Sequence, residues 1–293
     1  MLTHAFETRR KPSRVVVVGG EGFVGKAVVE RLRGEGAEVL SLGRREVDLL
    51  GNGAGERLAG RLREGDSVVL AAAIAPCKTA AMLRDNMILA SAMIEAIDRA
   101  RPAHIVNISS DAVYADLDQP LTETSWTAPG SLHGCMHLAR EIMFRSEAKA
   151  PLAILRPTLI YGAADPHNGY GPNKFRRQAN RGEDIVLFGE GEEERDHVCI
   201  DDVAEIVTRV LGHRSTGVLN IASGQVASFR ALAETAVRLS GRPVAVRGSV
   251  RQGPMPHNGW RPFAIDACRA AFPDFRYVSV ADGMAAAQAA EFS

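Results

Sequence analysis

The sequence lacks the features that would mark a membrane protein, a nucleic-acid binder or a disulfide scaffold. No run of about eighteen apolar residues occurs, so no transmembrane helix is predicted. The 35 basic residues equal the 35 acidic residues, and this zero formal charge favours neither nucleic acid nor an anionic membrane as a partner. Only four cysteines occur in 293 residues, none in a C-x-x-C pair, and we interpret them as free thiols in a reducing cytoplasm.

The beginning of the chain also lacks an apolar segment. It is polar and basic, which argues against a secretory signal peptide and predicts a flexible tail over residues 1–13. In the chain as a whole, hydrophobic residues make up 46% and charged residues 24%, the ordinary proportions of a soluble globular protein. A chain of 293 residues is long enough to form a large core in one or two closely packed domains.

A strand followed by a glycine turn is the most informative stretch. The four consecutive valines Val15–Val18 are β-branched and predict a strand that is buried on both faces. Gly19, Gly22 and Gly25 then lead into an amphipathic helical run. Such a turn directs free backbone N–H groups and the positive end of a helix at one point, which suits a pyrophosphate. The spacing is G-x-x-G-x-x-G instead of G-x-G-x-x-G, and a purely structural turn is the alternative.

Strands and helices alternate through the first half of the chain. Further strands are predicted at residues 38–42, 67–73, 104–108 and 152–155, and helices at residues 22–33, 57–63, 80–101 and 131–148. Repeated strand–helix units require right-handed crossovers and a parallel sheet, so we predict a doubly wound α/β fold. From Ile160 the composition changes, and residues 161–173 predict a long loop rich in glycine and proline.

The end of the second strand bears on the choice of nucleotide. Gly43 stands where an acidic residue would bond the ribose hydroxyls, and Arg44 and Arg45 follow it, which favours NADP(H) over NAD(H). The alternative is that both arginines are solvated turn residues. Asp48 is a candidate for the adenine edge. The third strand ends in three small residues, Ala71, Ala72 and Ala73. Their small side chains would let a flat cofactor lie against the backbone. The alternative is that they are ordinary core residues.

Several segments, taken in order, resemble the extended short-chain dehydrogenase/reductase family, which contains nucleotide-sugar epimerases, dehydratases and reductases. The matching segments are Gly19–Gly25 with Phe23 and Val24, Asn86 near the head of a helix, Ser109–Tyr114, Leu155–Thr158 with Pro157, Tyr161–Gly162 and Arg195–Ala204. The resemblance implies that Phe23, Val24, Asn86 and Pro157 contact the cofactor. It also implies hydride transfer between nicotinamide C4 and a nucleotide-linked sugar or a similar hydroxy or keto compound.

The resemblance also implies roles for polar residues. Ser110 matches the catalytic serine or threonine that bonds a substrate carbonyl or alkoxide, and a strand-end cap is the alternative. Arg195 matches an arginine that contacts the substrate diphosphate, and an ion pair with residues 192–194 is the alternative. Asn173 and Arg261 are further candidates for substrate contacts.

The chain departs from the family pattern at the acid/base pair. His133 and His137 stand where the family has its tyrosine and, four residues later, its lysine. His133 would act as general acid/base, because the ordinary histidine pKa of about 6.5 suits neutral pH. A neutral His137 would bond the nicotinamide ribose. Two alternatives remain open: a pocket that binds cofactor without efficient redox chemistry, and a zinc site, for which the sequence offers no third ligand.

Together these observations predict a Rossmann-like dinucleotide-binding domain of residues 14–161 plus 195–222. A smaller substrate-binding lobe of residues 162–194 plus 223–293 completes the chain, with the ligand crevice at the carboxyl ends of the strands. The expected partners are the dinucleotide and a small-molecule substrate, without a metal. By analogy with the family, a homodimer would form through the helices at residues 80–101 and 131–148.

Overall fold

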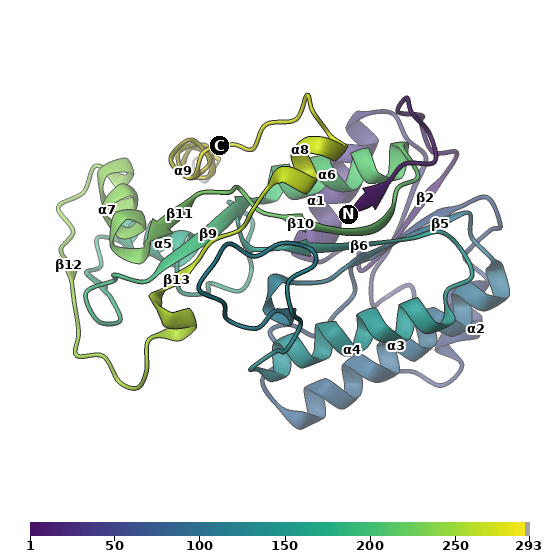
Figure 1. Cartoon of the computed structure of the whole chain (residues 1–293), viewed down its shortest axis with the longest axis horizontal. Coiled ribbons are helices and arrows are strands. Elements are labelled where there is room, and N and C mark those ends of the chain that lie inside the picture. The colour runs from purple at the N-terminus through teal and green to yellow at the C-terminus, as the bar shows by residue number, and fades with distance from the viewer. Residues whose placement is uncertain (291–293) are drawn as a thin grey trace.

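A seven-stranded sheet forms the centre of the molecule in the computed structural model, which describes residues 1–290 (Figure 1). The strands follow the order β1-β10-β6-β5-β4-β2-β3, and every neighbouring pair is parallel except β1 with β10. Their bounds are β1 Leu2–Thr3, β2 Val15–Val18, β3 Val39–Leu42, β4 Ser67–Leu70, β5 His104–Ile108, β6 Leu152–Pro157 and β10 Thr216–Ile221. The prediction of a mainly parallel α/β sheet is confirmed.

Helices cover both faces of this sheet, as a doubly wound fold requires (Figure 1). One face carries α1 (Phe23–Gly34), α6 (Ile200–Gly212) and α8 (Asp266–Ala271), and the other carries α2 (Ala54–Ala59), α3 (Ala80–Ala100) and α4 (Leu132–Glu147). The valines of β2 explain the arrangement: Val15 and Val17 enter the first core, and Val16 and Val18 enter the second. Within residues 1–290, no helix has the length and apolarity needed to cross a membrane.

A smaller unit packs beside the carboxyl ends of the central strands (Figure 1). Its sheet joins β7 (Leu159–Tyr161), β9 (Glu194–Cys199), β11 (Val226–Ser228) and β13 (Trp260–Arg261), and β8 (Ile185–Val186) pairs with β12 (Val246–Arg247). Its helices are α5 (Pro172–Arg181), α7 (Phe229–Ser240) and α9 (Val280–Ala289). The short helices η1 (Asp111–Val113) and η2 (Pro256–Gly259) complete the described elements.

The division between the two units differs in detail from the predicted boundaries. Helix α6 and strand β10 return to the central sheet as expected, but β7 and β9 pair in the smaller sheet. Helix α8 lies in the predicted substrate lobe, yet its Cys268, with Phe272 beyond it, packs into the core of the nucleotide domain. The end of the predicted lobe, residues 291–293, lies outside the described residues.

The amino-terminal segment is part of the central sheet, so the prediction of a flexible tail over residues 1–13 is wrong for its first half. Leu2 pairs antiparallel with Gly217, and the His4 Nδ1 atom lies 2.7 Å from the Ser215 hydroxyl. The His4 ring also stacks on His213. A segment without an apolar run is held here by edge hydrogen bonds and ring contacts, which composition does not reveal.

The buried His104 predicts a loss of stability in mild acid. Its Nε2 donates to the Ser215 carbonyl at 2.7 Å, and burial lowers its pKa to about 4. Because an unfolded histidine has a pKa of about 6.5, this stabilisation is complete above pH 6.5 and declines as the pH falls toward 4. At pH 5 the loss is on the order of 2 kcal/mol, measurable as the free energy of urea unfolding at pH 7 and pH 5.

A variant pair tests this assignment. His104→Gln should lose less stability between pH 7 and pH 5 than the wild type does. The exposed His167 provides the matched control, and His167→Gln should keep the wild-type pH dependence. An unchanged pH dependence in His104→Gln would show that other groups cause the acid sensitivity.

Candidate functional site

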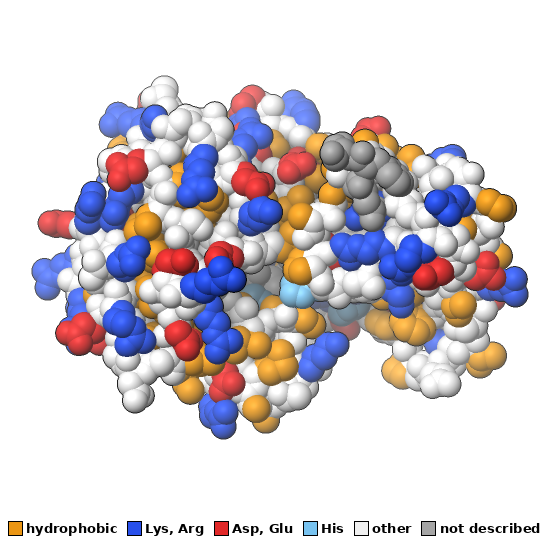
Figure 2. Space-filling view, turned by 180° about the vertical axis from the view of Figure 1, so that it is seen from behind, with side chains coloured by type: hydrophobic (Ala, Val, Ile, Leu, Met, Phe, Trp, Pro, Cys, Tyr) orange, Lys and Arg blue, Asp and Glu red, His pale blue; other side chains and the backbone are white. Residues whose placement is uncertain are grey.

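A cavity of about 930 Å³ lies at the carboxyl ends of the central strands, between the two units. Figure 2 shows histidine side chains in the hollow on one face of the molecule. The structure brings most of the predicted site residues to its wall: Gly22, Phe23, Val24, Gly25, Ala71, Ala73, Ser110, His133, His137, Pro157, Asn173, Arg195 and Arg261. Six predicted residues do not line it: Gly19, Arg44, Arg45, Asp48, Ala72 and Asn86.

The glycine turn has the close backbone packing that a dinucleotide cradle needs. Gly19 has a φ of +89°, and a Cβ there would lie 2.5 Å from the Ala72 nitrogen. A Cβ on Gly25 would lie 2.1 Å from the Gly19 carbonyl oxygen. Gly22 caps α1 without a side-chain hydrogen bond, so the first N–H groups of the helix are available to an anion. These features fit a pyrophosphate at the cavity wall.

The end of β3 carries two exposed arginines, Arg44 and Arg45, beside the carboxylates of Glu46 and Asp48. The Arg44 side chain is 79% exposed, and its Nε lies 3.7 Å from the Asp48 carboxylate. Glu46 accepts a hydrogen bond from the Gly43 N–H at 2.7 Å. A Cβ on Gly43 would lie 2.2 Å from the Glu21 carboxylate, so a larger residue there would require the exposed Glu21 side chain to move. The exposed guanidinium of Arg44 can therefore turn toward a ligand. The nearby carboxylates would, however, repel a negatively charged group of that ligand.

Asn86 and Ala72 lie next to residues of the cavity wall without lining the cavity themselves. Asn86 is fully buried, and its Oδ1 accepts the Ile74 N–H at 2.9 Å. Its Nδ2 donates to the carbonyls of Ile74 and Met82. The amide therefore holds the loop after β4 in place, whereas the prediction had assigned it a cofactor contact.

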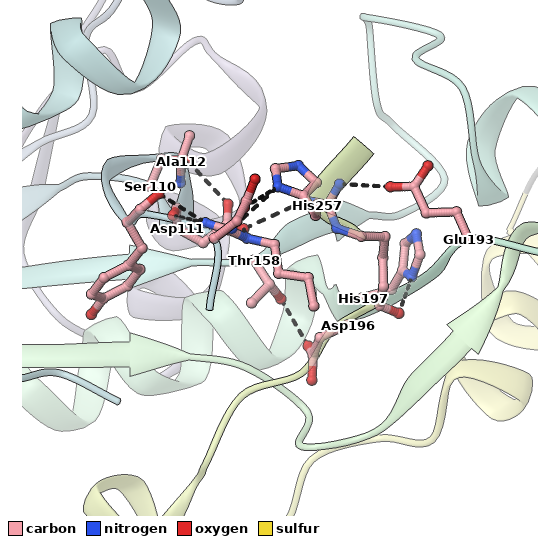
Figure 3. A network of polar contacts seen from close by, with 12 residues as sticks. Ser110, Asp111, Ala112, Thr158, Glu193, Asp196, His197 and His257 are labelled. Atoms are coloured by element: carbon pink, nitrogen blue, oxygen red, sulfur yellow. Dashed lines mark hydrogen bonds and ion pairs between the residues drawn. The ribbon is translucent and has the colours of Figure 1, made fainter. Parts of the chain in front are cut away.

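Ser110 follows β5 and makes the cap that the sequence offered as an alternative. It caps η1, because its Oγ accepts the Ala112 N–H at 3.1 Å, and it also lines the cavity (Figure 3). The same hydroxyl donates to Asp111 Oδ1 at 3.3 Å. The cap fixes the rotamer of Ser110, so the hydroxyl is held in position before any substrate binds.

The two histidines lie one turn apart at the start of α4, where Ser131 caps the helix by accepting the Gly134 N–H. Their ring centroids are 4.7 Å apart in an edge arrangement. The His133 Nδ1 accepts the Cys77 N–H at 3.4 Å, which assigns the proton of the neutral ring to Nε2.

Both rings are neutral at pH 7. Burial lowers the pKa of His133, partly opposed by the Asp111 carboxylate. Burial lowers the pKa of His137 much further, and the nearby charges of Arg140 and His133 add to the effect. Within residues 1–290, no group of three or more histidine, cysteine, aspartate or glutamate side chains is placed to hold a metal ion.

The predicted substrate arginines are paired with carboxylates. Arg195 contacts Glu193 at 3.2 Å and Asp111 at 3.7 Å, so the ion pair weighed as an alternative is present. Arg261 is 3% exposed and contacts Asp111 at 3.4 Å, with a second ion pair to Asp116. A phosphate would have to displace these carboxylates from the guanidinium groups.

Asn173 also has an internal partner at the cavity edge. Its Oδ1 accepts the Gly162 N–H at 3.0 Å, so the side chain orders the loop that begins the smaller unit. It lies in the first turn of α5 and lines the cavity.

Some residues of the site were not predicted. Asp196 accepts hydrogen bonds from Thr158 and Ser223, and burial raises its pKa to about 6 (Figure 3). Asp111 faces Ser110 and both arginines, and its place beside Ser110 was the signal that could have revealed it. His257 contacts Asp116 from 141 positions away, and no local sequence pattern indicates that contact.

Comparison with known proteins gives consistent matches. The model of the "NAD dependent epimerase/dehydratase family" matches residues 15–222. The chain is 29% identical over 283 residues to a dTDP-6-deoxy-L-talose 4-dehydrogenase (NAD(P)(+)) of Kitasatospora kifunensis, covering 88% of this chain and 89% of that protein.

Solved structures agree on the fold. A UDP-glucose 4-epimerase of Thermotoga maritima with UDP-glucose superposes with a TM-score of 0.82 at 21% identity, covering 95% of this chain and 98% of that one. A GDP-L-fucose synthetase of Naegleria fowleri bound to NADP superposes with a TM-score of 0.84 at 16% identity, covering 99% of this chain and 97% of that one.

Proposed function

Because the chain belongs to the NAD-dependent epimerase/dehydratase family, we propose that it transfers a hydride between a nicotinamide dinucleotide and a nucleotide-linked sugar or a related hydroxy or keto compound. The observation that supports this proposal is one cavity wall shared by the glycine turn, Ser110 and His133. A cofactor cradle, a placed hydroxyl and a titratable ring then act on the same bound substrate.

The bound dinucleotide supplies the hydride donor or acceptor. The Ser110 hydroxyl would bond the reacting oxygen, and the Nε2 of His133 would deliver or remove its proton. To accept a proton at Nε2, the neutral ring would first shift its own proton to Nδ1 and give up the contact with the Cys77 N–H; the resulting imidazolium would deliver the proton in the reverse direction. His137 would accept or donate a hydrogen bond at the nicotinamide ribose. Arg195 would bind a substrate phosphate after exchanging its carboxylate partners for it.

The direct test is a turnover assay with purified protein. Nucleotide-linked sugars are offered with each oxidised and reduced dinucleotide, and nicotinamide absorbance is followed. We expect cofactor-dependent turnover with a hydroxy or keto sugar. Tight dinucleotide binding without turnover on any substrate would support the second candidate, a dinucleotide-binding protein that lacks redox chemistry. The burial and neutrality of both histidines favour that candidate, since neither supplies a fixed positive charge.

We propose NADP(H) as the preferred cofactor and NAD(H) as the alternative. Arg44→Ala should weaken NADPH binding by about tenfold to a hundredfold, because a charge-assisted contact to the 2′-phosphate contributes about 1.5–3 kcal/mol. NADH affinity should change little. Fluorescence titration of both cofactors measures this, with the exposed Arg33→Ala at the far end of α1 as control. Equal effects on both cofactors would exclude the 2′-phosphate contact.

We propose that the protein forms a homodimer and acts in the cytoplasm. Helices α3 and α4 pack side by side, and Ile88 and Ile142 on these helices are exposed. An apolar residue on each helix supports the expected pairing of the same two helices in a second copy.

A further inference from the structure

His257 is a histidine of the cavity wall that is paired with a carboxylate. It lies in η2, and its Nδ1 atom is 2.6 Å from Oδ1 of Asp116. The same oxygen forms an ion pair with Arg261, so it acts as an acceptor. A separation of 2.6 Å between the ring nitrogen and this oxygen requires a hydrogen between them, because two bare acceptors would repel each other. His257 therefore carries a proton on Nδ1.

The ring of His257 is neutral at pH 7. The Nη1 atom of Arg261 lies 3.2 Å from its Nδ1, and this positive charge opposes a second ring proton. Burial lowers the pKa of His257, and the charges of Arg195 and Arg261 add to the effect, whereas Asp116 opposes it. A neutral ring with its proton on Nδ1 has a free lone pair on Nε2. Within residues 1–290, no group bonds that nitrogen.

This arrangement distinguishes His257 from the histidine assigned to proton transfer. The Nδ1 of His133 accepts the Cys77 N–H, so the neutral His133 ring has an N–H donor at Nε2. His257 has an acceptor at Nε2 instead. An ionised phosphate has no hydrogen to offer to such a nitrogen, so the matching group on a nucleotide-linked sugar is a hydroxyl.

A continuous series of contacts connects His257 with Ser110. Figure 3 shows His257 in the same polar network as Ser110 and Asp111. Ser110 donates to Asp111, Asp111 pairs with Arg261 at 3.4 Å, and Arg261 pairs with Asp116, which bonds His257. All five residues line the cavity. Because Ser110 would bond the reacting oxygen, the part of the substrate that meets this wall is the sugar.

We propose that His257 is a specificity-determining residue whose bare Nε2 accepts a hydrogen bond from a hydroxyl of the substrate sugar. Asp116 is the positioning residue that holds the ring in this tautomer. The sugar contact rests on the proposed function, but the tautomer does not. A site that bonds a hydroxyl discriminates against the deoxy sugar, which leaves the polar group of the protein without a partner. The pair therefore selects for a hydroxyl besides the reacting oxygen that Ser110 bonds.

Nitrogen NMR of the histidine rings tests the tautomer without any ligand. The signals of His257 are identified by their loss in His257→Asn. At pH 7 we expect a protonated Nδ1 and a bare Nε2. Asp116→Ala removes the bond that selects this tautomer and should increase the Nε2–H form. A wild-type ring with a protonated Nε2, alone or together with a protonated Nδ1, overturns the proposal.

Calorimetric binding of UDP-glucose, dTDP-glucose and GDP-glucose, with reduced dinucleotide present, tests the sugar contact. His257→Asn keeps an amide N–H at the position of Nδ1 and tolerates the φ of +51°, but it has no atom at the position of Nε2. It should bind the sugar nucleotide about tenfold to a hundredfold more weakly. His257→Gln, whose amide reaches the position of Nε2, should lose less affinity. Asn258→Gly, at an exposed neighbour outside the cavity wall, should bind as the wild type does.

Deoxy analogues of the bound sugar identify the hydroxyl that His257 accepts. When the sugar lacks that hydroxyl, the wild type and His257→Asn should bind it with equal affinity, since the contact is absent from both complexes.

The outcomes distinguish this proposal from the proposed function. Equal affinity of the wild type and His257→Asn for every sugar nucleotide overturns the sugar contact, as does a wild type that binds none of them. Weaker binding by His257→Asn, in a protein without turnover, supports the contact and contradicts the proposed hydride transfer. The same loss of binding in His257→Asn and His257→Gln, with a lower midpoint of urea unfolding in both, would show that His257 is merely structural.

Discussion

Ser110→Ala and His133→Ala should each lower kcat by about 10²- to 10⁴-fold, because each removes a group that handles the proton of the reacting oxygen. Ser110 is held by its cap to Ala112, so its hydroxyl is already placed at the cavity wall. His133 lines the cavity, and its Nε2 would exchange the proton once the ring gives up the contact of its Nδ1 with the Cys77 N–H. Steady-state kinetics with the substrate found in the turnover assay measure both effects.

Cofactor affinity provides the control for this experiment. Neither side chain is assigned to the dinucleotide, so the dissociation constants of NADPH and NADH should stay within about threefold of the wild type in both variants, a free-energy change below about 1 kcal/mol. Ser146→Ala, on the same helix but far from its first turn, should retain full turnover. Wild-type kcat in both Ser110→Ala and His133→Ala would contradict the mechanism.

The structure also refines the test of a silenced enzyme. His133→Tyr with His137→Lys would restore the tyrosine and lysine of the related family. Within residues 1–290, the buried guanidinium of Arg140 has no ion pair, so a lysine at position 137, one turn away, would place two buried cations near each other, and they would repel. The informative variant therefore adds Arg140→Met. Activity that appears only in the triple variant supports a silenced enzyme, and activity below that of the wild type supports native histidine chemistry.

Local patterns predicted the central part of the fold because they act over a few residues. The valine strand, the glycine turn and the helix after it are each determined by sterics and by alternating burial within one segment. Ser110 and His133 were singled out by the resemblance to the dehydrogenase/reductase family instead, and both line the cavity at the carboxyl ends of the strands.

Contacts between distant segments were not predicted, for a physical reason. Arg261 meets Asp111 across 150 positions, and the antiparallel pairing of Leu2 with Gly217 spans most of the chain. Neither contact has a signal in residue type or periodicity.

Replacing Glu141 by leucine should lower the free energy of unfolding by about 3–5 kcal/mol, because it leaves a buried arginine without its counter-ion. Glu141 is fully buried and accepts two hydrogen bonds from Arg156, at 2.8 and 2.6 Å, and one from Ser109 at 2.6 Å. Arg156 also donates to the Tyr114 hydroxyl at 2.7 Å, which in turn bonds Asn220. Urea unfolding at pH 7 measures the loss.

The double variant Glu141→Leu with Arg156→Met separates the charge from the packing. With both charges removed, an apolar pair of similar size should recover most of the lost stability, since buried ion pairs are often no more stabilising than apolar replacements. The exposed Glu147 at the end of α4 is the control, and Glu147→Leu should change stability by less than about 0.5 kcal/mol. The double variant could instead be as unstable as Glu141→Leu. The loss of stability would then come from the hydrogen bonds that Ser109 and Tyr114 make in this network. Those bonds, and not the ion pair of Glu141 with Arg156, would stabilise the segment around Ser110.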